Sequence, residues 1–365
     1  MIGPRRAGKT FFMFQISEDL TRNFGKDDMV YVDFEDLMCR VEHSELIHVP
    51  NDPLPDRRVL FLDEVQSIDD WSSWLRGLHN MGRFPIFVSG SSSRLLSREI
   101  ATQLRGRSIT RVVFPFSPSE VLQYEGATDR RALAVLHRYL EWGGFPRVYL
   151  SSSKIDLLES YVDTIFFRDV VERFRVRDIE GARIFRDLVM SNLGQIFSIS
   201  KTAKFLKSIG VDKSKKTLAE LMSQFQEAFM IFTVPRYSRS ARGIIQTPRK
   251  VYPVDVGLFQ PFSSMAESLT RRFESLVAIQ LYKQHLLTAQ RVYYWQDQHG
   301  HEVDFVVVGR RGVETLVQVC YDATDGKTRE REEQGLVRAS RELGCKNLTV
   351  ITGRVGLHAQ YRAAC

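Results

Sequence analysis

The chain has 365 residues, 43% of them hydrophobic and 26% charged, a balance typical of soluble globular proteins rather than of disordered or fibrous chains. Because one ordinary hydrophobic core rarely organises so many residues, two or three domains are expected. A net charge of +7 permits contact with nucleic acid without requiring it. Apolar runs fall short of the ~18 residues that a membrane-spanning helix needs, and the chain opens on a glycine-rich segment rather than on a signal peptide. The four cysteines are scattered in no zinc or redox spacing, so a cytoplasmic protein with reduced thiols and no membrane partner is expected.

The first third of the chain alternates between strand-like and helical segments. Strands are predicted at 29–34, 59–62 and 85–89, helices at 10–23 and 71–81, and a further buried strand at 111–116. Strands separated by helices pair in parallel, so an α/β fold with ligands at the carboxyl ends of the strands is expected. Only Met1 and Ile2 precede the glycine-rich segment, and we therefore expect the sheet to lack most of its first strand, as in a chain whose N-terminus is truncated or was assigned late.

Residues 3–10 match the phosphate-binding pattern GxxxxGK[ST] at every fixed position. Glycine lets the backbone wrap around a phosphate so that several N–H groups converge, and the helix that follows directs its positive end at the same oxygens. We expect Lys9 to neutralise the β- and γ-phosphates and the Thr10 hydroxyl to bind Mg²⁺, which makes ATP and Mg²⁺ the predicted ligands. The candidate nucleotide-binding residues in this segment are Gly3, Pro4, Arg5, Arg6, Ala7, Gly8, Lys9, Thr10 and Phe11.

Two carboxylates, Asp63 and Glu64, end the apolar strand predicted at 59–62. A buried strand holds Asp63 rigidly enough to orient Mg²⁺, and Glu64 is then placed to polarise the attacking water. A strand that ends in solvated acids is the ordinary alternative. The phosphate-binding loop at a suitable distance favours the catalytic interpretation.

Two further segments are candidates for contact with the γ-phosphate. Ser89 and Ser91 follow the next predicted strand, where small polar residues either face the phosphate and the attacking water or form an ordinary loop. Arg105 and Arg107 flank a glycine, and arginine complements phosphoryl charge in a fork geometry. The alternative for this pair is a solvated basic turn.

The middle of the chain is helical from 129 to 178, with a turn at 142–146. Helices at 199–208 and 213–230, joined by a turn and followed by a strand from 231, predict a winged helix. Positive charge is concentrated here, at Lys201, Lys204, Lys207, Lys213, Lys215 and Lys216, and it continues through Arg236, Arg239, Arg242, Arg249 and Lys250. Such clustering favours contact with DNA phosphates, with little readout of bases. The alternative is a solvated helical face or a docking module within the protein.

Taken together, these motifs resemble one family, the prokaryotic, archaeal-type AAA-like P-loop ATPases that carry a C-terminal restriction-endonuclease-like domain of unknown function. The segments that carry the resemblance span essentially the whole chain, at 3–10, 62–66, 89–92, 104–107, 143–146 and 252–258. The resemblance implies a parallel AAA-like sheet, a helical and winged-helix middle and a C-terminal α/β domain of the PD-(D/E)xK class.

In that class a helix Glu, a strand Asp and a following (D/E)xK bind Mg²⁺ and activate water. Glu274 on a predicted amphipathic helix and Asp304 on a predicted strand occupy the first two positions, although both can also be solvated or capping acids. The next strand offers Gln318 and Cys320 in place of the acid and the lysine, so metal affinity falls and a fixed positive charge is lost. We therefore expect weak Mg²⁺ binding and no cleavage. Lys327 lies a few residues downstream and is a candidate to replace the missing lysine, but nothing in the spacing requires it.

The predicted domains are an ATPase domain at 1–125, a helical linker at 126–190, a winged helix at 191–260 and the nuclease-like domain at 261–365. The leading hypothesis is Mg²⁺-dependent ATP binding and hydrolysis that drives a switch or motor on nucleic acid. An ATP-dependent DNA nuclease and a signalling NTPase with a protein partner remain alternatives. A homo-oligomer is a further expectation, because such ATPases often complete their site with an arginine from a neighbour.

Overall fold

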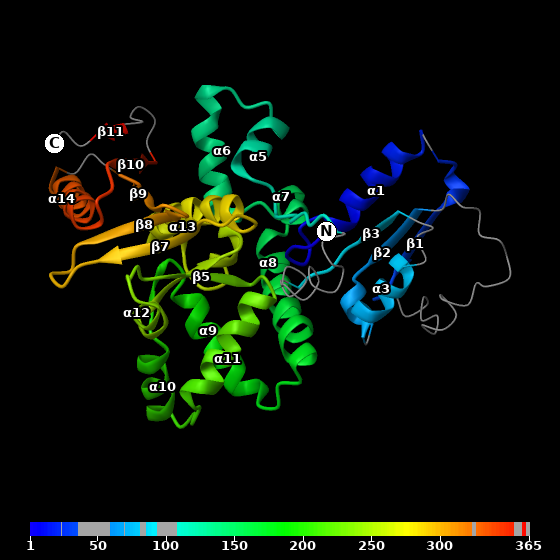
Figure 1. The fold of residues 1–365 in the computed structure, drawn as a ribbon, viewed down its shortest axis with the longest axis horizontal. Coiled ribbons are helices and arrows are strands. Elements are labelled where there is room, and N and C mark those ends of the chain that lie inside the picture. The colour runs from blue at the N-terminus through cyan, green and yellow to red at the C-terminus, as the bar shows by residue number, and fades with distance from the viewer. Residues whose placement is uncertain are drawn as a thin grey trace. The chain divides into compact units, whose positions relative to one another are not determined.

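The computed structural model describes residues 1–22, 24–35, 59–68, 70–80, 85–92, 108–322, 326–353 and 360–362. The chain divides into two compact units, one formed by residues 1–115 with 227–229 and the other by 116–226 with 230–365 (Figure 1). Within the described residues, every helix is too short or too polar to cross a membrane.

The first unit is built on a parallel sheet of three strands in the order β1-β2-β3 (Figure 1). The strands are β1 (Met29–Asp33), β2 (Val59–Asp63) and β3 (Ile86–Val88), and the helices are α1 (Lys9–Leu20), α3 (Trp71–Asn80) and the 3₁₀ turns η1 (Lys26–Asp28) and η3 (Val65–Ser67). The three predicted strands and two predicted helices of this part are confirmed. Strand β2 alternates as the pattern requires, because Leu62 belongs to a core with α3 whereas Val59 and Phe61 belong to a core with α1.

Ile2 extends the sheet beyond β3, since it forms parallel bridges with both Gly90 and Val112. Its backbone N–H donates to the carbonyl of Arg111, and its carbonyl accepts from Val113. The strand predicted at 111–116 is therefore wrong in extent, because the structure has only a single bridge there.

The second unit begins with helices that cover residues 118–191. They are α5 (Pro118–Tyr124), α6 (Asp129–Trp142), α7 (Pro146–Leu150), α8 (Lys154–Thr164), which continues into a π-helical stretch η5 (Ile165–Glu172), and α9 (Ile179–Ser191). Helix α5 starts with a capping box, in which Ser117 and Glu120 satisfy each other's backbone N–H groups. The helical prediction for this region is confirmed.

A three-stranded antiparallel sheet with three helices follows, in the strand order β4-β6-β5. The elements are β4 (Gln195–Phe197), α10 (Ile199–Ser208), α11 (Lys215–Glu227), β5 (Ile231–Pro235), α12 (Ala241–Gln246) and β6 (Arg249–Pro253). Helix α11 is shorter than the predicted helix at 213–230. Its apolar residues recur at helical spacing, so Leu218, Leu221, Met222 and Phe225 are buried together on one face.

The C-terminal part has a five-stranded sheet in the order β11-β10-β9-β8-β7 (Figure 1). Strands β7 to β9 form an antiparallel meander, and β10 lies parallel to β9. The elements are the 3₁₀ turn η6 (Val256–Phe259), α13 (Met265–His285), β7 (Arg291–Gln296), β8 (Glu302–Gly309), β9 (Gly312–Cys320), α14 (Gly326–Leu343), β10 (Asn347–Thr352) and β11 (Gln360–Arg362). The helix predicted to carry Glu274 and the strands predicted to carry Asp304 and Gln318 are confirmed.

Two segments far apart in the sequence meet at the buried carboxylate of Asp255. Its Oδ2 accepts from the N–H of Gly144 at 2.8 Å, and its Oδ1 accepts from the N–H of Gly257 at 2.9 Å. Gly143 has a φ of +74°, and a Cβ there would lie 1.7 Å from Asp255 Oδ1, so only glycine fits. This contact joins the turn after α6 to η6.

Arg272 of α13 makes a second connection to α6 and is fully buried. Its guanidinium donates to the carbonyls of Leu140 and Glu141, each at 3.1 Å, and to that of Ser263 at 3.0 Å. Burial lowers the pKa of Arg272 to about 10. Helix α13 is thus anchored to α6 through a charge whose donors are satisfied by backbone carbonyls.

Candidate functional site

The predicted phosphate-binding loop lies between Ile2 and the start of α1 at Lys9. Gly3 has a φ of +153°, and a Cβ there would come within 1.9 Å of the Val113 carbonyl oxygen. Gly8 is left-handed, with a φ of 98°, and directly precedes the helix. Both glycines are therefore required by the backbone, which supports a loop shaped for close approach of a ligand.

Lys9 is buried at the base of this loop. Its ammonium donates to the carbonyls of Gly3 at 3.3 Å and Pro4 at 3.1 Å, and it lies 3.4 Å from Oε1 of Glu64. Two carbonyls and one carboxylate thus hold the ammonium at the loop, where a phosphate would compete with them for it.

Asp63 and Thr10 meet directly. The Thr10 hydroxyl donates to Asp63 Oδ2 at 2.7 Å, the Tyr31 hydroxyl donates to the same oxygen at 2.8 Å, and Ser89 donates to Oδ1. Asp63 is only 1% exposed. Hydroxyl and carboxylate oxygens form the hard donor set that Mg²⁺ prefers, so Thr10 and Asp63 suit that ion. Burial and the Asp63 carboxylate raise the pKa of Tyr31, which keeps it a hydrogen-bond donor.

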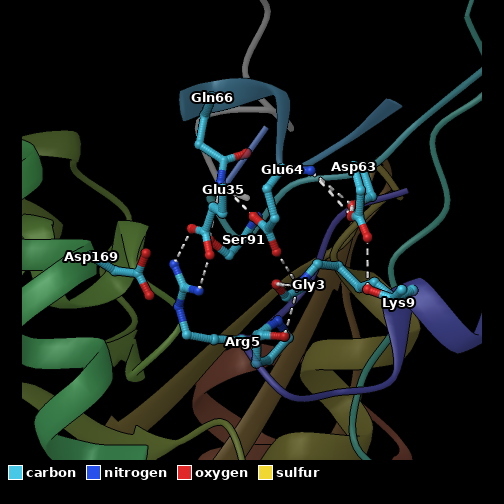
Figure 2. Close-up of polar contacts among 12 residues, drawn as sticks. Gly3, Arg5, Lys9, Glu35, Asp63, Glu64, Gln66, Ser91 and Asp169 are labelled. Carbon is cyan, nitrogen blue, oxygen red and sulfur yellow. Dashed lines mark hydrogen bonds and ion pairs between the residues drawn. The ribbon is translucent and has the colours of Figure 1, made fainter. Parts of the chain in front are cut away.

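Glu64 lies at the end of β2 with a φ of 51°, an uncommon conformation for a residue with a side chain. Its Oε2 accepts from the N–H of Ser91 at 3.1 Å and from the Gln66 amide, as Figure 2 shows. Burial by itself would raise the pKa of Glu64, but Lys9, Gln66 and Arg5 outweigh it and lower the pKa. The carboxylate is thus ionised and held in one orientation.

Arg5 extends from the loop to Glu35, just beyond the end of β1. The two form a bidentate pair with distances of 2.8 and 2.7 Å (Figure 2). Burial, together with the Asp63 carboxylate, raises the pKa of nearby Asp33.

Three residues of this site, Glu35, Tyr31 and Gln66, were not predicted from the sequence. Glu35 and Gln66 follow the carboxyl ends of neighbouring parallel strands, and this position alone would have indicated them.

The predicted site residues thus divide into three groups. Lys9, Thr10, Asp63, Glu64 and the two serines, Ser89 and Ser91, converge at the carboxyl edge of the sheet. Phe11 is 76% exposed on α1. Arg105 and Arg107 lie outside the described residues.

The basic region of the second unit presents most of its lysines to solvent. Lys201, Lys204, Lys207, Lys215 and Lys216 are exposed on α10 and α11. Lys213 instead pairs with Asp178 at 2.6 Å. The grouping of Lys250 with these cations is wrong, because Lys250 is 3% exposed and faces three carboxylates. Strand β6 is the central strand of its sheet, so a side chain there is covered on the inner face.

The three carboxylates around Lys250 belong to Glu274 of α13 and to Glu302 and Asp304 of β8. The Lys250 Nζ lies 2.8 Å from Glu274 Oε1, 2.5 Å from Glu302 Oε1 and 2.9 Å from Asp304 Oδ1. Burial raises the pKa of Glu274 to about 7, with Lys250 opposing the shift and Asp304 adding to it. Burial would lower the pKa of Lys250, but the carboxylates, Asp304 foremost, raise it well above its ordinary value.

Gln318 and Cys320 point to other partners. The Gln318 carbonyl accepts from the N–H of Asp304 at 3.3 Å, and its amide donates to Glu332 on α14. The Cys320 thiol contacts the carbonyl of Asp322 at 3.2 Å. Lys327 lies in α14, and its side chain is outside the described residues. Among the residues that the structure describes, no group of His, Cys, Asp and Glu side chains is arranged to hold a metal.

Three family models match the chain. An AAA domain matches residues 1–122, a domain of unknown function (DUF8612) matches 133–268, and a second domain of unknown function (DUF4143) matches 270–355. The uncharacterized protein MJ1544 of Methanocaldococcus jannaschii is 32% identical, and the match covers 95% of this chain and 80% of that protein. An uncharacterized protein of Haemophilus influenzae is 25% identical over 76% of this chain and 72% of its own length.

Among solved structures, the Walker-type ATPase paby2304 of Pyrococcus abyssi has a TM-score of 0.42 and 12% identity, covering 72% of this chain and 89% of that one. The Orc1 protein of Aeropyrum pernix, solved in complex with DNA, has a TM-score of 0.34 and 11% identity over 77% and 87% of the two chains. At these scores neither likeness carries an inference about this chain. The domain match and the archaeal relative do: residues 1–122 form an AAA domain, and the chain belongs to the same family as MJ1544.

Proposed function

We propose that this protein hydrolyses ATP in the presence of Mg²⁺ and uses the reaction to drive a conformational switch or motor on nucleic acid. The observation that carries the proposal is the convergence of Lys9, Thr10, Asp63 and Glu64 around one loop, in which a side chain at Gly3 would collide with a backbone carbonyl. A strand end, a loop and a helix start supply these four groups, and their chemistry matches the needs of phosphoryl transfer.

Binding is assigned to the loop and the two residues that follow it. Lys9 exchanges its two carbonyl contacts for β- and γ-phosphate oxygens, to which an ammonium binds more strongly because they are charged. Thr10 and Asp63 hold Mg²⁺, which when bound neutralises charge on the phosphates. Tyr31 and Ser89 keep Asp63 in place, since both donate to its carboxylate.

Turnover is assigned to Glu64. Its lowered pKa keeps it ionised at neutral pH, so it can accept a hydrogen bond from the attacking water. Ser91 and Gln66 hold one of its oxygens, which fixes the orientation of the other. Loss of this carboxylate should therefore affect the chemical step more than nucleotide affinity.

Nucleic acid is the favoured partner because of the order and charge of the middle elements. The succession α9, β4, α10, α11, β5, α12 and β6, with its antiparallel sheet, supports the proposal of a winged helix. Exposed Lys201, Lys204 and Lys207 recur at three-residue intervals along α10, and Lys215 and Lys216 lie at the start of α11. Phosphate contacts from such residues release counterions and make binding strongly dependent on salt.

For the C-terminal part we propose a restriction-endonuclease-like domain that does not cut DNA. Helix α13, the meander β7–β9, helix α14 and the parallel strand β10 follow one another in the order expected of that fold. Gln318 and Cys320 occupy the positions of an acid and a lysine, and both make contacts elsewhere. Such a domain serves as a docking surface for nucleic acid or protein.

The test is the ATPase rate with and without duplex and single-stranded DNA, measured with Mg²⁺ and with EDTA. We expect Mg²⁺-dependent hydrolysis that DNA stimulates, and less stimulation in Lys201→Glu/Lys204→Glu. A matched control is Arg310→Glu/Arg311→Glu, which changes charge equally at exposed positions in the turn between β8 and β9. If both double variants lose DNA stimulation equally, the effect of DNA depends only on the net charge of the protein. An ATPase indifferent to DNA, with a protein partner recovered, would favour the signalling NTPase.

A further inference from the structure

The inference concerns Lys250 and the carboxylates that surround it within the second unit. Lys250 and Tyr252 lie two residues apart on β6, so both side chains leave the same face of the strand. Tyr252 donates to Glu274 Oε1 at 2.6 Å, the oxygen that Lys250 also contacts. Two alternate positions of β6 therefore contact the same carboxylate, that of Glu274 on α13.

The contacts of the ammonium match its chemistry. Lysine carries three N–H donors and no acceptor. Its three carboxylate neighbours, Glu274, Glu302 and Asp304, each present one oxygen within 2.9 Å. A buried carboxylate without a counter-charge is very costly, so this cluster depends on a cation.

The other polar groups near the cluster already have hydrogen-bond partners. Asp304 Oδ2 accepts from the N–H of Val319 at 2.9 Å, while its Oδ1 faces Lys250. Gln318, the residue that replaces the acid on β9, turns its carbonyl to the backbone of β8 and its amide to Glu332. The carboxylate and amide oxygens that would bind a metal in a nuclease thus contact the Lys250 ammonium and backbone N–H groups instead.

We propose that the Lys250 ammonium is the resident cation of the cluster formed by Glu274, Glu302 and Asp304, standing where a divalent metal would be bound in a nuclease of this architecture. The proposal rests on the geometry of the cluster and is independent of the ATPase function. In place of the weak Mg²⁺ site expected from the sequence, it gives this cluster a set of ion pairs that joins β6 to α13 and β8 without a metal. Arginine cannot take the same place, because its planar fork does not point three donors at three converging oxygens.

The experiment measures Mn²⁺ binding by electron paramagnetic resonance, with nucleotide-free full-length protein at neutral pH. Wild type, Asp304→Asn, Lys250→Met and Lys250→Met/Asp304→Asn are compared, and the quantity scored is the binding that depends on Asp304. All four proteins share the same phosphate-binding loop, so any Mn²⁺ held there cancels in the comparison.

We expect no Asp304-dependent binding in wild type up to millimolar Mn²⁺, and one additional site in Lys250→Met that disappears in the double variant. Asp304-dependent binding in wild type overturns the proposal, as does a folded Lys250→Met protein without the additional site. Circular dichroism and the thermal midpoint establish folding. If Lys250→Met does not fold, the comparison of wild type with Asp304→Asn decides, because the wild-type cluster either binds Mn²⁺ or does not.

Discussion

The hydroxyl of Thr10 donates a 2.7 Å hydrogen bond to Oδ2 of Asp63, and this bond joins the first turn of α1 to the end of β2. The two residues are neighbours only because α1 packs on the sheet, with Met13 against Val59 and Phe61. Phosphate-binding loop and metal-orienting carboxylate are thereby held at one edge of the sheet, where Lys9 and Glu64 also meet.

Lys9→Ala should abolish ATP hydrolysis and weaken ATP binding by at least about tenfold. The ammonium is the buried cation of the loop, and the variant leaves the phosphates to the backbone N–H groups alone. Isothermal titration calorimetry with ATP and Mg²⁺ measures the loss, and removal of a charged hydrogen-bonding group is expected to cost about 1.5–3 kcal/mol or more. Lys26→Ala, in the turn before β1, is a control that should bind normally. Unchanged affinity in Lys9→Ala would contradict the role assigned to the loop.

Glu64→Gln should bind ATP as tightly as wild type and lose turnover. A neutral amide cannot accept the proton of the attacking water, and the loss of a general base typically costs about a hundredfold or more. The measurement pairs ATP affinity with the steady-state ATPase rate. Glu18→Gln, at an exposed position of α1, is the matched control and should keep the parent rate. A Glu64→Gln protein that hydrolyses ATP at the parent rate would remove Glu64 from the mechanism.

Arg105 or Arg107 is expected to complete the site from a neighbouring subunit, with an intrachain role as the alternative. An arginine placed on the transferring phosphate stabilises charge that develops in the transition state. Arg105→Ala and Arg107→Ala should therefore reduce the ATPase rate with little change in ATP affinity. Analytical ultracentrifugation with ATP separates the two arrangements, since a strict monomer that remains fully active rules out an arginine acting between subunits.

The C-terminal domain is expected not to cleave DNA. The strand β9 lacks the acid and the lysine, and loss of one electrostatic donor is worth about a hundred- to a thousandfold. The assay incubates supercoiled and linear DNA with Mg²⁺ or Mn²⁺, with and without ATP. Cleavage that disappears in Asp304→Ala would promote the nuclease alternative to first place.

Stability should depend on pH through Asp255. Burial raises its pKa from 3.8 to about 6 in the folded chain, although Gly144, Gly257 and Lys283 oppose the shift. The folded state therefore keeps a proton that the unfolded state has released, so the contribution of Asp255 is largest below about pH 4 and is lost as pH rises to about 6. The expected slope is at most about 1.4 kcal/mol per pH unit.

The measurement is the thermal midpoint of wild type and of Asp255→Asn between pH 4.5 and 7.5. Asparagine stays neutral but cannot accept from both N–H groups, which lowers the midpoint by an amount independent of pH. The midpoint of wild type relative to the variant should fall from pH 4.5 through about pH 6 and level off only above that. A difference that is constant over the whole range would contradict the raised pKa.

The local sequence pattern was sufficient to predict the features that depend only on residues close together in the chain, namely the helices, the strands and the residues at their ends. The GxxxxGK[ST] spacing placed Lys9 and Thr10 at the start of a helix, and an apolar alternation placed Asp63 and Glu64 at the end of a strand. Strands and helices are set by periods of two and 3.6 residues, so their order along both units could be predicted. The strand predicted at 111–116 was wrong in extent, because within the described residues this segment contributes one bridge, between Val112 and Ile2.

Tertiary packing alone decided which side chains meet across these elements. Tyr31 and Glu35 join the nucleotide site because β1 pairs with β2, and Asp255 meets Gly144 because η6 packs on the turn after α6. Lys250 was grouped from the sequence with the surface cations, since a basic segment is usually solvated. Its charge is buried because β6 faces α13 and β8, and the burial of a charge depends on contacts that no local spacing encodes.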